Sequence, residues 1–178
     1  MNERIGKKFD RLEGVRRGIE ARIDGLESDA LNMRPSPGSW SAAQAIGHIV
    51  LAEERTLEYI GKKLSDPSRL RPAGLKERFK GRLVTLVMGV PIRFRAPEIV
   101  AHVADHHEPA DLLARWARVR GDLGALLDSV PVSLLDTCLY KHPAAGPMTL
   151  ADALDFMTAH SSRHAKQIER ILREVVRR

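Results

Sequence analysis

The stretch that decides the fold is "TLADALDFMTAHSSRHAKQIERILREV", residues 149–175. Its apolar side chains recur at steps of three and four residues, the period of a helix with one buried face; they are Leu150, Leu154, Met157, Ile168, Ile171 and Val175. Thr149 can cap the start of this helix, with Asp152 as its partner three residues on. The pattern predicts a long core helix that begins after Thr149.

Three further amphipathic helices precede it. The first covers roughly residues 5–26, and the third follows Pro109. The second begins at Ser41, where Gln44 completes a capping box, and extends to about Leu64. The apolar faces of the first and third helices are formed by Ile5, Phe9, Leu12, Ile19, Ile23 and Leu26, and by Leu112, Trp116, Val119, Leu123, Leu126 and Val130.

The segment between the second and third helices, roughly residues 65–108, is expected to be irregular because prolines punctuate it. Its apolar piece "GRLVTLVMGVPIRF", residues 81–94, is expected to be partly buried, as a strand, a helix or a loop. Four helices with one long connection predict an all-α protein, a four-helix bundle with a long crossover between helices 2 and 3. The length favours a single domain over residues 1–178.

Composition limits the cellular setting. The single Cys138 cannot form an intramolecular disulfide, which is consistent with a reducing compartment, and we expect the cytoplasm. The first residues are charged and lack an apolar targeting segment, and no run of about eighteen apolar residues follows. We therefore expect a soluble chain that is not exported and has no membrane partner.

The net charge of +6 is concentrated in the crossover. Residues 61–95 contain ten Lys or Arg against Asp66 and Glu77, a local balance of +8. Only Phe79 and Phe94 are aromatic there, so the segment lacks the repeated stacking residues of a single-strand binder. We expect a solvated basic crossover and no nucleic-acid partner, with an anionic ligand or a phosphate backbone as the alternatives.

Two histidines of the last helix, His160 and His164, stand four residues apart and can converge on one metal ion. The helical steps from Met157 place them on or beside the buried face. His48 lies in the second helix on the face of Ala45 and Ala52, whose small side chains leave room beside it. Three neutral imidazoles from two helices predict a metal site with open positions; the alternative is that each ring is a satisfied polar group between helices.

A second cluster and one carboxylate are weaker candidates. "HVADHHEP", residues 102–109, also holds a histidine pair, His102 and His106, with Asp105 and His107 adjacent. That run is short, polar and next to a proline, which favours a solvated helix end or a lip over the main pocket. Glu53 is interpreted as a partner of the metal ligands or as an exposed charge at the edge of the buried helix face. The sequence does not identify a general acid or base.

Two segments, "PGSWSAAQAIGHIVLAEER" (37–55) and "GPMTLADALDFMTAHSSRHAKQI" (146–168), resemble the metal-site helices of the DinB/YfiT-like superfamily. The resemblance extends over nearly the whole chain. It implies an up-down-down-up four-helix bundle, commonly dimeric, that binds a divalent metal through the positions that are here His48, His160 and His164. Known activities in this family include thiol-dependent transferases and isomerases that use bacillithiol or mycothiol.

The leading hypothesis is a metal-dependent enzyme that acts on a small-molecule substrate, as a thiol-dependent S-transferase or as a hydrolase. Imidazole ligands suit zinc, nickel, iron and copper alike, so the sequence does not identify the metal. The alternative is a non-catalytic dimeric bundle, with structural metal or none, that binds an acidic partner through the basic crossover.

Overall fold

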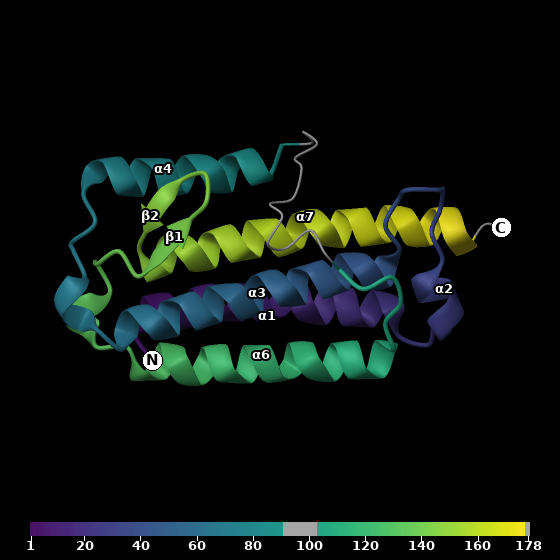
Figure 1. The fold of residues 1–178 in the computed structure, drawn as a ribbon, viewed down its shortest axis with the longest axis horizontal. Helices are drawn as coiled ribbons and strands as arrows, with labels where there is room; N and C mark the ends of the chain where they lie inside the picture. The colour runs from purple at the N-terminus through teal and green to yellow at the C-terminus, as the bar shows by residue number, and fades with distance from the viewer. Residues whose placement is uncertain (91–102, 177–178) are drawn as a thin grey trace.

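Four long helices form the frame of the molecule, and the computed structural model describes residues 1–90 and 103–176. They are α1 (Glu3–Ile23), α3 (Ala42–Leu64), α6 (Pro109–Ser129) and α7 (Leu150–Val176). Figure 1 shows α1 and α7 running in one direction and α3 and α6 in the other, which is the predicted up-down-down-up bundle. Within it α7 packs on α1 and α3, and α6 packs on α3 and α1.

The predicted helix starts of α3 and α7 are confirmed. The Ser41 hydroxyl accepts from the Gln44 backbone N–H, and the Gln44 side chain accepts from the Ser41 N–H, which is the full capping box. The Thr149 hydroxyl likewise accepts from the Asp152 N–H and donates to its carboxylate. Both ends are therefore determined by side chains a few residues apart in the sequence.

The first helix is shorter than its apolar pattern suggested. It ends at Ile23, and Leu26 lies beyond it because Gly25 adopts a left-handed conformation with φ 73° that turns the chain. A short helix that was not predicted, α2 (Ser28–Asn32), follows and packs on α3 and α7.

The expectation of an irregular segment over residues 65–108 is wrong in its first half. A short 3₁₀ turn (Pro67–Arg69) precedes α4 (Leu75–Met88), a helix that packs on α7, with Gly81 lying against Met148 and Asp152. The sequence obscured this helix because its apolar residues occupy two faces, one packed on α7 and one exposing Leu75, Phe79, Leu83 and Leu86. Phe94, His102 and the last four residues of the apolar piece 81–94 lie outside the described residues.

A small β-hairpin that was not predicted joins α6 to α7. After a second 3₁₀ turn (Val132–Leu134), β1 (Tyr140–His142) pairs antiparallel with β2 (Gly146–Met148), and His142 lies opposite Gly146. Figure 1 shows the hairpin between α4 and α7. Among the described helices, none is both long enough and apolar enough to cross a membrane.

The core consists of two apolar clusters, one toward each end of the bundle. One includes Ile19, Ile46, Trp116 and Ile168, and the other includes Leu12, Ile60, Leu123 and Leu154. Along each long helix, a polar residue lies between the positions of the two clusters, and these four residues are joined by hydrogen bonds: Glu13, Glu53, Arg120 and Ser161. His160 directly precedes Ser161.

Candidate metal site

The structure brings together the three histidines that the sequence singled out. One ring nitrogen of each of His48, His160 and His164 lies within 4.8 Å of the others, and His48 Nε2 is 3.2 Å from His160 Nε2. His48 comes from α3 and the other two come from α7, which packs against it in the opposite direction. Elsewhere in the described part of the chain, no other group of three or more His, Cys, Asp or Glu side chains converges in this way.

Burial favours the unprotonated form of two of these rings, because it lowers their pKa. Desolvation, reinforced by the neighbouring His164 and His48, lowers the pKa of His160 well below its ordinary value. Desolvation and the nearby His48 lower the pKa of His164 to about 4, against a raising effect of Gln167. Unprotonated imidazole is the form that binds metal ions, so the lowered pKa values favour metal binding by both rings.

Gln167 orients His164 from one turn further along α7. Its Oε1 lies 2.8 Å from His164 Nδ1, so the imidazole proton on Nδ1 is donated to the amide oxygen and the Nε2 lone pair is left available. Sequence reasoning missed Gln167, although its spacing of three residues from His164 on a helix was a usable signal.

The three histidines lie in a cleft of about 2060 Å³ lined by residues of α3, α4, the hairpin and α7. Trp40, which precedes α3, packs beside His48 and His164, with ring centroids 5.1 and 6.4 Å away. Phe156 stacks near His160 at 5.8 Å. Aromatic rings thus surround the imidazoles, and the cleft gives a small molecule access to them.

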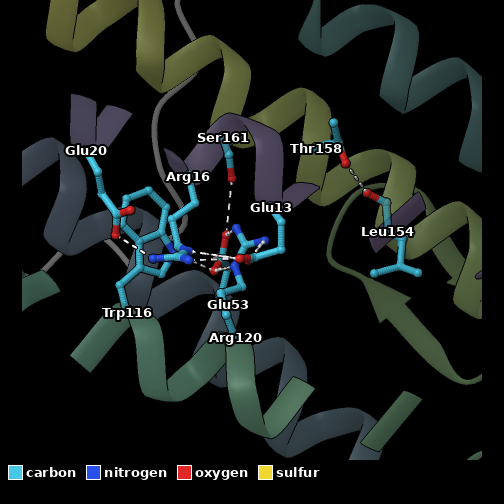
Figure 2. A network of polar contacts seen from close by, with 9 residues as sticks. All are labelled: Glu13, Arg16, Glu20, Glu53, Trp116, Arg120, Leu154, Thr158 and Ser161. Atoms are coloured by element: carbon cyan, nitrogen blue, oxygen red, sulfur yellow. Dashed lines mark hydrogen bonds and ion pairs between the residues drawn. The ribbon is translucent and has the colours of Figure 1, made fainter. Parts of the chain in front are cut away.

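Glu53 is not the exposed charge that was one of its two interpretations, and its hydrogen bonds to described residues go to Arg120, Trp116 and Ser161. It is 2% exposed and forms a bidentate ion pair with Arg120, at 2.6 and 2.8 Å. The Trp116 indole N–H and the Ser161 hydroxyl also donate to it. Figure 2 shows the network continuing through Glu13 to Arg16 on α1. Burial raises the pKa of Glu53, while the charge of Arg120 and these hydrogen bonds oppose the rise.

His102 of the second histidine pair lies outside the described residues, so the pairing of His102 with His106 stays a prediction. His106 is exposed and pairs with Glu108 at 3.0 Å. His107 packs against Gly47 of α3, where its Nε2 is buried without a hydrogen-bond partner in the described chain. Its role here is packing beside α3, because a Cβ at position 47 would lie only 2.7 Å from that nitrogen.

The fold and the site together define a class of protein, an up-down-down-up helical bundle with histidines lining a cleft. A sequence model of the DinB superfamily matches residues 11–168, and the chain therefore belongs to the DinB superfamily. YuaE of Bacillus subtilis (strain 168), an uncharacterized protein, is 23% identical over 164 residues, which cover 89% of this chain and 96% of YuaE.

A solved structure shares the fold. YfiT from Bacillus subtilis superposes with a TM-score of 0.55 at 18% identity, covering 97% of this chain and 88% of that one. That protein is described as "a probable metal-dependent hydrolase with an unusual four-helix bundle topology".

Proposed function

We propose that this protein is a divalent-metal-dependent enzyme that acts on a small molecule, with His48, His160 and His164 as the metal ligands. The observation that carries the proposal is the convergence of three ring nitrogens, within 4.8 Å of one another, at a wide cleft. Three neutral nitrogen donors suit zinc, nickel, iron or copper, and they leave coordination positions for water or substrate.

The residues around the histidines have separable roles in this proposal. When bound, a divalent ion supplies Lewis acidity and lowers the pKa of a water or a thiol toward neutrality. Gln167 holds the His164 ring in the tautomer that presents Nε2. Trp40 and Phe156 restrict the space beside the histidines and position a substrate that enters the cleft.

Hydrolysis is the reaction class that we propose first. The description of YfiT as a metal-dependent hydrolase supports this choice. Thiol-dependent transfer, a homodimer and a cytoplasmic location stay predictions that rest on the family resemblance and on composition. An assay with and without a low-molecular-weight thiol separates the two reactions, because hydrolysis does not require the thiol.

Metal binding is the first prediction to test. We expect purified protein to bind one divalent ion per chain, by elemental analysis and calorimetric titration. We expect His48→Ala, His160→Ala and His164→Ala each to weaken binding by at least about 100-fold, the upper range for loss of a residue that only supports a ligand. His106→Ala is the matched control, because it removes an exposed imidazole outside the cleft.

Unchanged affinity in all three variants would contradict the proposal and leave the non-catalytic bundle as the better interpretation. In that interpretation, the protein functions by binding an acidic partner through the basic crossover, residues 61–95. It predicts binding that weakens steeply with salt and is indifferent to the three histidines.

A further inference from the structure

The turn of the hairpin holds a fourth imidazole in a defined tautomer. His142 Nδ1 accepts hydrogen bonds from the backbone N–H groups of Ala144 and Ala145, at 3.1 and 3.0 Å. A nitrogen that accepts carries no proton, so the neutral ring has its proton on Nε2. Burial lowers the pKa of His142, which favours the neutral ring at neutral pH.

The His142 ring lies in the wall of the same cleft as the three histidines. It packs edge-on against Phe156, with centroids 4.4 Å apart, and Phe156 in turn stacks near His160. Nε2 makes no hydrogen bond to residues 1–90 and 103–176, and this atom is not fully buried. His142 is therefore a lining residue of the cleft with an N–H donor available for a ligand, and one aromatic ring, Phe156, separates it from His160.

The charges lining the cleft favour a negatively charged ligand. The two acidic residues among its described lining residues are already paired, Glu53 with Arg120 and Glu58 with Arg55 and Lys62. Four exposed basic residues that line it have no carboxylate partner in the part of the chain that the structure describes: Lys80, Lys141, Lys166 and Arg170. The resulting positive potential attracts anions into the cleft.

We propose that the substrate carries an anionic oxygen group, a carboxylate or a phosphate, and that His142 donates a hydrogen bond from Nε2 to it while the reacting part of the molecule reaches the three histidines. This assignment rests on the function proposed above, because the three histidines supply the other end of the site. A carboxylate and a phosphate ester both present the charged acceptor that a fixed N–H donor and nearby cations recognise.

The tautomer can be tested without any ligand. A long-range nitrogen–hydrogen correlation spectrum of the histidine rings, with His142 identified from the His142→Gln spectrum, is expected to show the proton on Nε2 and a non-protonated Nδ1. A proton on Nδ1 would overturn the proposal, because Nε2 would then be an acceptor that repels an anionic oxygen.

Binding is tested with acetate and inorganic phosphate as probes, titrated into the metal-loaded protein. We expect His142→Ala to weaken binding of at least one probe about tenfold, the worth of one hydrogen bond to a charged group. His142→Gln retains an N–H donor and is expected to lose less than about threefold, and His106→Ala is expected to lose nothing. The probe with the larger dependence on His142 identifies carboxylate or phosphate as the recognised group.

The two proposals can fail separately. Equal anion affinity in the wild-type protein and in both His142 variants, with metal binding intact, would overturn the role of His142 alone. If the chain binds no metal but anion affinity still depends on His142, the metal-dependent function falls and the anion site stands. Metal stoichiometry and thermal melting of each variant show whether the fold and the three-histidine site are preserved.

Discussion

At the residue scale, the buried pair of Glu53 and Arg120 has the largest predicted effect on stability. Arg120 is 2% exposed and its other carboxylate contact, Glu13, lies 3.3 Å away. Glu53→Gln would leave the guanidinium charge largely uncompensated in the core. We expect the free energy of unfolding to fall by about 3 kcal/mol or more, measured by urea denaturation.

The neighbouring Glu54→Gln is a matched control on the same helix. Glu54 pairs with Arg115, but both side chains remain partly exposed, at 30% and 42%. Exposed pairs typically contribute about 0–1 kcal/mol, so this variant should lose much less stability than Glu53→Gln. Similar losses of unfolding free energy in the two variants would show that burial does not make the Glu53–Arg120 pair more stabilising than an exposed pair.

At the element scale, the start of α3 determines where His48 stands. The capping box satisfies backbone N–H groups that the first turn of a helix otherwise leaves without partners. Ser41→Ala should lower the free energy of unfolding by about 1 kcal/mol. We expect metal affinity to be unchanged, because His48 lies almost two turns further along α3. Calorimetric melting measures the stability, and metal titration measures the affinity.

Ser133→Ala provides the comparison for this prediction. Ser133 is exposed in the second 3₁₀ turn, and its hydroxyl makes no hydrogen bond to any described residue. A surface change of this kind usually alters stability by less than about 0.5 kcal/mol. A loss for Ser41→Ala no larger than this would mean that the cap contributes little to α3.

At the scale of the whole molecule, metal binding should stabilise the fold. A ligand that binds only the folded chain raises the free energy of unfolding by about 2.7 kcal/mol when its free concentration is 100 times its Kd. For a domain of this length each kcal/mol raises the Tm by about 2–4 °C, so we expect a rise of about 5–10 °C. The chelator EDTA should reverse it.

His160→Ala should abolish the rise in Tm, while His106→Ala should retain it. The first variant removes one of the converging ring nitrogens, and the second removes an exposed ring outside the cleft. An equal rise in both variants would locate the stabilising ion at another site.

The sequence by itself determined the four long helices and the start of two of them. Helical period, caps and the spacing of His160 and His164 are local properties, because they depend on residues three or four apart. The helix α4 was not predicted because both of its faces carry apolar residues. The hairpin was not predicted because its strands are only three residues long.

Only the tertiary structure decided which distant groups meet. His48 was a candidate from its helix face, but its distance to His160 depends on α3 and α7 packing in opposite directions. The sequence left Glu53 as a partner of the metal ligands or an exposed charge, and only the packing of α6 brings Arg120 and Trp116 to it. The tautomer of His142 likewise follows from the hairpin turn that folds two backbone N–H groups onto its ring. Local sequence encodes the faces of the helices, whereas burial, ion pairing and ring protonation depend on the neighbours that packing supplies.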